Sequence, residues 1–300
     1  MTQTVLIAGA SGRFGAAAHC AFQSAGWITK TYNRHSETLL EAAQGVDVIV
    51  NALNPPDYKN WDTELPRITQ EVIEAAKASG ATVLLPGNVY NFGTQTGPWS
   101  DTTPHVAHTQ KGQIRIDLEI AYKEAGIQTI VLRGGDFFGP DSTGSWLDLV
   151  MLKSLHKGKL VYPGNPDIPH AWAYLPDMAR AAVMLCNIRG ELANFCDVPF
   201  PGFNVSGRDI VQALELASGQ KLKLEQMQWW PIKVASPFWR MGRELLEMRY
   251  LWDHPHELDG TKFRAFLPDF VGTSFKEAMA AMLPVDIKPN EPVIRAKALA

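Results

Sequence analysis

A glycine-rich turn near the amino terminus constrains the fold more than any other stretch of the chain. Its glycines, Gly9, Gly12 and Gly15, follow an apolar run at 4–8 that predicts a buried strand. Apolar residues at helical spacing over 13–25 predict a helix directly after the turn. This order is typical of dinucleotide binding, because the glycines allow a tight turn and let the backbone approach a pyrophosphate. The free N–H groups at the start of the helix then face the phosphates. The spacing is a variant, G-x-x-G-x-x-G, so a tight turn without a ligand remains the alternative.

The bulk composition excludes several classes of protein. With 300 residues, 46% of them hydrophobic and 20% charged, the chain has the composition of an ordinary globular protein with a large core. A net charge of −3 gives no reason to expect nucleic acid or an anionic membrane as a partner. Cys20, Cys186 and Cys196 lack metal-ligand or redox spacing, so we expect no metal site and a reducing, cytoplasmic compartment. No secretory signal and no membrane-spanning apolar run are seen.

The first half of the chain alternates predicted strands and helices. Further strands are expected over 27–32, 46–51, 82–85 and 128–132, and helices over 37–43, over a stretch from Leu65 that Gly80 ends, and over 110–124. Apolar strands separated by helices predict a parallel sheet that is covered on both faces. Such sheets bind ligands beyond the carboxyl ends of their strands. The loops at Gly9, Asn33, Ala52, Pro86 and Gly134 should therefore share one edge.

The second half changes character and predicts a smaller lobe. Helices are expected over 145–156 and 176–187, a loop over 161–166, and a helix to Ala217 that Ser206 caps. From Gln228 the chain is aromatic, and these side chains either line a substrate cleft or form the core of the lobe. We therefore expect three parts. Residues 1–140 are a dinucleotide-binding core, 141–283 return partly to the core sheet and partly form a substrate lobe, and 284–300 are a tail.

Four segments in order carry a resemblance to a known family: Gly9–Gly15, Val89–Gly93, Leu132–Pro140 and His170–Ala179. Over about residues 3–283 the chain resembles the extended short-chain dehydrogenase/reductases, the NAD(P)-dependent epimerase/dehydratase family. The resemblance implies an α/β fold, a Rossmann-type doubly wound parallel sheet with a small C-terminal substrate lobe. It also implies a small-molecule substrate and a possible homodimer formed through two sheet-side helices.

Charge at the end of the second strand indicates which cofactor is preferred. NAD binders usually carry an acidic residue there, whereas an arginine favours the 2′-phosphate of NADP. Here Asn33 and Arg34 follow the strand, no acid occurs before Glu37, and Arg13 lies in the glycine turn. We therefore expect NADP(H) rather than NAD(H). The expected cofactor-binding residues are Gly9, Ser11, Gly12, Arg13, Phe14, Gly15, Asn33, Arg34, Ala52, Leu53, Lys111 and Gly134.

The catalytic residues that the resemblance implies are only partly present. The family's Tyr-x-x-x-Lys pair places a lysine at the nicotinamide ribose, where it assists the tyrosine in proton transfer. Lys111 matches that lysine, but Ala107 stands in the tyrosine position and Pro86 in that of the usual serine or threonine.

Three other groups are candidates for the proton transfer. Candidate catalytic residues are thus Lys111, Tyr90 and His108, and His105 lies on the same loop. Asp136 has no clear role, and Asp177 is predicted to cap a helix that begins near Met178.

Two functions therefore remain open. The first is an NADP-dependent oxidoreductase or epimerase/dehydratase-like enzyme that acts on a small carbonyl, sugar or nucleotide-linked substrate. The second is a non-catalytic NADP(H)-binding sensor or partner-binding protein, which the missing tyrosine at position 107 favours.

Overall fold

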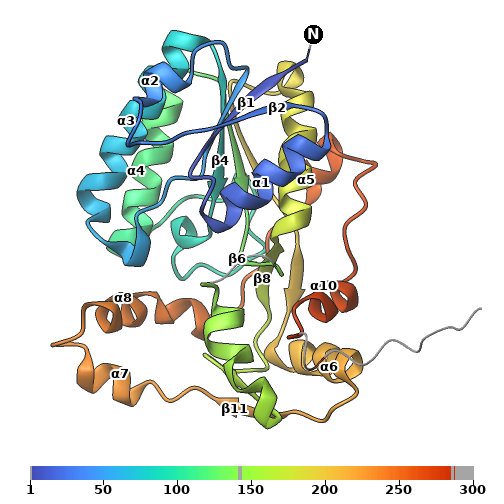
Figure 1. Ribbon diagram of the computed structural model, residues 1–300. Helices are drawn as coiled ribbons and strands as arrows, with labels where there is room; N and C mark the ends of the chain where they lie inside the picture. Colours follow the sequence, from blue (N-terminus) through green and yellow to red (C-terminus); the bar gives the residue numbers. More distant parts are fainter. Residues whose placement is uncertain (1, 141–143, 285–286, 288–300) are drawn as a thin grey trace, which may run out of the picture.

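A six-stranded parallel sheet forms the centre of the upper part of the molecule in Figure 1. The computed structural model describes residues 2–140, 144–284 and 287. Within them the strand order is β2-β1-β3-β4-β5-β9, and every neighbouring pair is parallel. The strands are β1 (Thr4–Ala8), β2 (Ile28–Thr31), β3 (Val48–Asn51), β4 (Thr82–Gly87), β5 (Thr129–Arg133) and β9 (Phe195–Pro199). The predicted fold class, a doubly wound parallel sheet, is confirmed.

Helices cover both faces of this sheet (Figure 1). Along β1, Val5 and Ile7 pack with the helices of one face, and Leu6 and Ala8 pack with those of the other. This alternation follows from the two-residue period of a strand. The first face carries α1 (Arg13–Ser24) and α5 (Leu175–Asn187), and the second carries α2 (Leu39–Ala42), α3 (Trp61–Ser79) and α4 (Gln110–Glu124).

A smaller lobe lies below the carboxyl edge of the sheet in Figure 1. One of its sheets has the strand order β10-β8-β6, and β7 pairs with β11. Its strands are β6 (Asp136–Phe138), β7 (Lys159–Tyr162), β8 (His170–Tyr174), β10 (Phe203–Val205) and β11 (Lys223–Gln226). Its longer helices are α6 (Gly207–Ser218), α7 (Trp230–Ala235), α8 (Arg240–Met248) and α10 (Phe275–Ala281). Helix α9 (Thr261–Phe266) packs instead on the larger sheet, beside β9. Trp229 and Trp252 belong to its core, whereas Trp230 and Trp239 are exposed.

Short helical turns connect these elements. They are η1 (Pro56–Tyr58), η2 (Tyr90–Phe92), η3 (Leu147–Met151), η4 (Leu152–Lys157), η5 (Arg189–Glu191) and η6 (Arg249–Asp253). The segment predicted as a helix over 145–156 is helical, but as a π-helical turn followed by a 3₁₀ turn with a non-helical Ser154, and not as a regular α-helix. The predicted loop over 161–166 is also partly wrong, since Val161 and Tyr162 pair in parallel with Glu225 and Gln226. That partner strand is remote in sequence.

Several helix ends lie where the sequence placed them. Gly80 ends α3 with a left-handed φ of 73°, and the Ser206 hydroxyl accepts from Asp209 N–H at the start of α6. The prediction for Asp177 is wrong, because α5 begins earlier, at Leu175. The Asp177 carboxylate instead accepts from Thr273 N–H at 2.6 Å. Most of the predicted tail, 284–300, lies outside the described residues.

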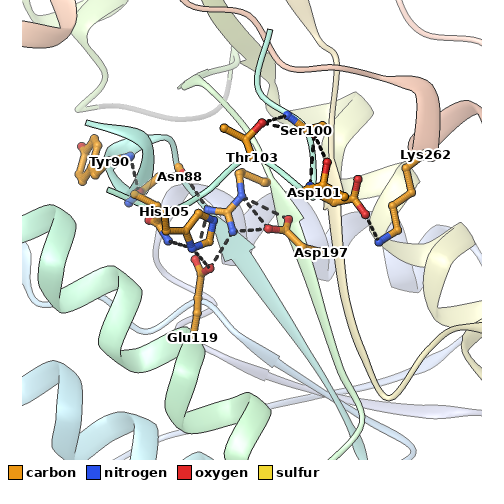
Figure 2. A network of polar contacts seen from close by, with 12 residues as sticks. Asn88, Tyr90, Ser100, Asp101, Thr103, His105, Glu119, Asp197 and Lys262 are labelled. Carbon is orange, nitrogen blue, oxygen red and sulfur yellow. Dashed lines mark hydrogen bonds and ion pairs between the residues drawn. The ribbon is translucent and has the colours of Figure 1, made fainter. Parts of the chain in front are cut away.

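A buried arginine at the end of β5 joins three parts of the larger lobe. Arg133 is fully buried, and its guanidinium lies 2.7 Å from Glu119 of α4 and 2.6 Å from Asp197 of β9. It also donates to the Asn88 carbonyl at 2.7 Å. Burial alone would lower the pKa of Arg133, but the carboxylates of Asp197 and Glu119 raise it above the ordinary value. Figure 2 shows this network around Asn88, Glu119 and Asp197.

The substitution Arg133→Met should destabilise the protein strongly, because it leaves two buried carboxylates without a counter-charge. We expect the free energy of unfolding at pH 7, from urea denaturation, to fall by about 3–5 kcal/mol. Adding Glu119→Gln and Asp197→Asn should recover much of the loss. An unchanged unfolding midpoint in the single variant would show that the cluster contributes nothing.

Candidate cofactor site and catalytic residues

The glycine turn after β1 is packed too tightly for any other residue type. Gly9 has a φ of 93°, and a Cβ there would lie 2.6 Å from the Ala52 carbonyl oxygen. A Cβ on Gly15 would lie 2.0 Å from the Gly9 oxygen, and Gly12 N–H donates to that same oxygen at 2.9 Å. The outer side of the turn, at Ser11, Gly12 and Arg13, is exposed. Helix and strand therefore touch through backbone, and the turn presents its free side to solvent.

The start of α1 offers an open anion-binding end. The N-cap residue is Gly12, so no side chain caps the first N–H groups, and the first turn contains no acidic residue. Uncapped N–H groups and the positive end of the helix dipole favour a phosphate. Because β1 pairs with β2 on one side and with β3 on the other, this helix end lies where the strand order reverses. That is the usual ligand position in such sheets. The residues present thus fit a dinucleotide pyrophosphate.

The other predicted cofactor residues lie in three places: an exposed turn after β2, the loop after β3, and a buried corner after β5. Asn33 and Arg34 are exposed in a turn after β2, in which Asn33 Oδ1 accepts from His35 N–H at 3.1 Å. Ala52 and Leu53 form the β3 loop against Gly9. Gly134 is buried, and a Cβ there would lie 2.7 Å from the Phe137 ring, so packing at this corner accounts for that glycine. Its contact with the cofactor stays a prediction.

Lys111 is buried at the start of α4 and is held by the smaller lobe. Its ammonium forms ion pairs with Glu244, at 2.5 Å, and with Glu247, both on α8. Its backbone N–H also donates to Glu247, at 3.2 Å. The ammonium lies 4.9 Å from the centre of the Tyr58 ring. In this conformation two carboxylates neutralise the Lys111 ammonium, which by the resemblance would bind the nicotinamide ribose.

Tyr58 is a candidate site residue that the sequence did not reveal. Its hydroxyl lies 3.5 Å from that of Tyr90, the predicted catalytic tyrosine in η2. Asp57, Tyr58 and Asn60 all have left-handed backbone conformations, with φ of 55°, 57° and 52°. Such strain in non-glycine residues is concentrated at functional sites. The only signal was indirect, since Asn54-Pro55-Pro56 breaks the chain after β3, at the ligand-binding edge of the sheet.

The electrostatics of this cluster disfavour Tyr90 as a proton-transferring group. Burial, and then the neighbouring Tyr58, raise the pKa of Tyr90 well above the ordinary value for tyrosine. A phenol that resists ionisation near neutral pH is a weak acid–base catalyst. Tyr90 is therefore better placed to support Tyr58 than to exchange a proton itself.

The two loop histidines differ in their surroundings. His108 is exposed, and its ring lies 4.9 Å from the ring of Tyr250. His105 is half-buried, and burial, followed by Arg133, lowers its pKa. Its Nδ1 lies 3.8 Å from Glu119 (Figure 2). His105, Glu119 and Asp197 present ligand atoms close enough together for a metal ion. The Arg133 guanidinium already lies between the two carboxylates, so this group is an ion-pair network.

Asp136 faces the same region from β6. It is half-buried, and burial raises its pKa to about 7, an effect that the positive charge of Arg13 opposes. Its own charge raises the pKa of Tyr90. The next residue, Phe137, packs against Phe14 of α1, with ring centres 6.4 Å apart. Asp136 therefore lies between the glycine turn and the tyrosine pair. The sequence analysis had assigned it no role.

Comparison with solved structures identifies the fold. No family model matches this chain, and neither does any curated protein. MoeE5 in complex with UDP-glucose and NAD is similar with a TM-score of 0.74 and 14% identity, over 93% of this chain and 97% of that one. UDP-N-acetylglucosamine 4-epimerase from Bacillus cereus gives 0.70 and 12%, over 94% and 98%. RMD from Pseudomonas aeruginosa complexed with NADPH gives 0.69 and 14%, over 94% and 98%.

The chain has the fold of the NAD(P)-dependent epimerases and dehydratases. The resemblance drawn from four short motifs is thereby confirmed at the level of the fold. Among the described residues, no helix combines the length and the apolar character needed to cross a bilayer.

The substitution Gly15→Ala should abolish cofactor binding, because its Cβ would push α1 away from the Gly9 carbonyl. We expect a loss of at least about 100-fold in nicotinamide-nucleotide affinity by calorimetry, since a misplaced helix end no longer presents its N–H groups together. Gly190→Ala is the matched control, because nothing lies within 4 Å of a Cβ at that glycine. Equal affinities for both variants would rule out the turn as the binding element.

Proposed function

We propose that this protein is an NADP(H)-dependent oxidoreductase or epimerase/dehydratase-like enzyme that acts on a sugar or nucleotide-linked carbonyl substrate. The observation that carries the proposal is the uncapped start of α1 above a turn that only glycine can form. Solved structures of the same fold hold NAD or NADPH, and two of them hold UDP-sugars. Three free cysteines fit the expected reducing, cytoplasmic compartment, and a homodimer stays a prediction.

Charge supports NADP(H) rather than NAD(H). Arg13 and Arg34 are both exposed at the edge of the sheet where the predicted site lies. No acidic side chain follows β2 before Glu37, so nothing there would repel a 2′-phosphate. Guanidinium groups bind phosphate through paired N–H donors.

NADPH should bind more tightly than NADH by about tenfold or more, as expected for one charge-assisted phosphate contact. Arg34→Ala should remove most of this difference while it leaves NADH affinity unchanged, which calorimetry with both nucleotides would measure. Arg208→Ala removes a comparably exposed arginine from the smaller lobe and is the control. Equal affinities for NADPH and NADH in the parent protein would overturn the preference for NADP.

Proton transfer is assigned to the cluster around Lys111. The bound nicotinamide ring supplies or accepts a hydride at C4. Lys111, once released by Glu244 and Glu247, would orient the ribose, as the resemblance implies. Tyr58 would then exchange the proton in place of the tyrosine missing at position 107, with Tyr90 beside it. His108 remains the alternative proton donor.

A second function has a specific observation in its favour. The ammonium of Lys111 is already neutralised by two carboxylates, and the family's tyrosine is absent at Ala107. Both features suit an NADP(H)-binding sensor or partner-binding protein in which α8 responds to the nucleotide without turnover. The strained backbone at Tyr58 favours the enzyme, because a sensor has no evident need for it.

The substitution Tyr58→Phe should distinguish the two candidate proton donors, Tyr58 and His108. With an epimerase or reductase substrate in hand, we expect kcat to fall by about 100-fold or more, the usual size of a lost general acid–base catalyst, at unchanged NADPH affinity. His108→Ala is the matched variant and should retain most of the activity. If the loss appears in His108→Ala and not in Tyr58→Phe, the assignment is reversed.

A further inference from the structure

The hairpin formed by α7 and α8 exposes an apolar surface that no other element covers in the described part of the chain. Its side chains Trp230, Val234 and Phe238 are 67%, 70% and 96% exposed, and Trp239 is 43% exposed. Trp230 and Val234 lie four residues apart on α7 and so share one face of that helix, and Phe238 lies in the turn that follows. Large exposed aromatic groups gathered in this way mark an interaction surface.

The same segment has a charge opposite to that of the whole protein. Between Gln226 and Arg243 there are three basic residues, Lys233, Arg240 and Arg243, and no Asp or Glu. The segment 226–243 therefore carries a local charge of +3, whereas the complete chain carries −3. Beyond it, α8 continues with Glu244 and Glu247, which form ion pairs with Lys111. All three basic residues are exposed.

The hairpin protrudes from the molecule, and hydrogen bonds at its base and within its turn hold it in place. In Figure 1 the turn between α7 and α8 is the outermost point on the left of the smaller lobe. Behind it, the buried Trp229 donates its indole N–H to the Pro163 carbonyl at 2.6 Å. Arg243 closes the turn by donating to the carbonyls of Ser236, at 3.1 Å, and Pro237, at 3.2 Å. The aromatic side chains are thus presented on a preformed tip.

We propose that this α7–α8 hairpin docks the protein on an anionic membrane surface. Trp and Phe side chains enter the boundary between headgroups and acyl chains, while Lys and Arg bind anionic headgroups. The low net charge of the whole chain does not oppose this, because surface attraction acts within about a Debye length, ~10 Å. The proposal is independent of the cofactor and of turnover.

The local charge also disfavours the main competing occupant, a second copy of the chain. A two-fold interface places the same patch on both partners, so a dimer through this tip would bring Lys233, Arg240 and Arg243 of both copies together. Like charges that face each other at an interface are unfavourable, whereas anionic lipid supplies the complementary charge.

The test is sedimentation of the full chain with vesicles of phosphatidylcholine, with and without phosphatidylglycerol. We expect binding only with phosphatidylglycerol, and loss of binding at high salt. Lys233→Gln and Arg240→Gln should each weaken binding about fivefold. The double variant Trp230→Ala/Phe238→Ala should weaken it about tenfold or more.

Matched controls separate the hairpin from general surface effects. Leu216→Ala/Val271→Ala removes apolar side chains that are 66% and 78% exposed elsewhere, and Lys77→Gln/Lys123→Gln removes two exposed cations from α3 and α4. Both should bind vesicles like the parent protein. The proposal is overturned if no vesicle binds or if hairpin and control variants behave alike. It is also overturned if the protein does not sediment with vesicles, while analytical ultracentrifugation shows a dimer that the Trp230→Ala/Phe238→Ala variant converts to monomer.

Discussion

The backbone contact between Gly15 and the Gly9 carbonyl is the constraint on which the functional part of the structure depends. It brings α1 against the end of β1 with no side chain between them. The helix therefore begins at the point where the strand order of the sheet reverses, and its first N–H groups stay free. A side chain at Gly15 would push the helix away from the Gly9 carbonyl, and one at Gly9 would collide with the Ala52 carbonyl. The close approach of Gly15 to the Gly9 carbonyl thus sets both the packing of α1 and the free helix start that would bind a phosphate.

Charge connects this sheet to the smaller lobe. Glu244 and Glu247 of α8 reach across to Lys111 of α4, so the two lobes meet at the position expected to bind the nicotinamide ribose. Any ligand that recruits Lys111 must compete with these carboxylates. If the cofactor recruits Lys111 as proposed, its binding would be coupled to the position of α8, which forms one arm of the exposed hairpin.

The sequence predicted those features that depend on local patterns. Helix α4, the glycine end of α3 and the Ser206 cap follow from spacing and capping preferences within a few residues. The strands of the smaller lobe were missed, because β7 and β8 find their partners far along the chain. Asp177 was misassigned because a tertiary contact with Thr273, not a helix end, uses its carboxylate.

The candidate site likewise contains residues that local sequence patterns predicted and residues that they did not. The glycine turn and Lys111 were found through motif spacing, whereas Tyr58 and Asp136 lie in segments that only the fold brings near them. The net charge is likewise an average over 300 residues, and it does not reveal the basic segment 226–243.

A crystal structure of the protein with NADPH tests the central claim most directly. The account predicts pyrophosphate oxygens within about 3 Å of the N–H groups that open α1, which is hydrogen-bond distance. It also predicts that Lys111 turns from Glu244 to the nicotinamide ribose, beside Tyr58. NADPH bound elsewhere, or an unchanged Lys111 ion pair beneath a fully bound nucleotide, would contradict it.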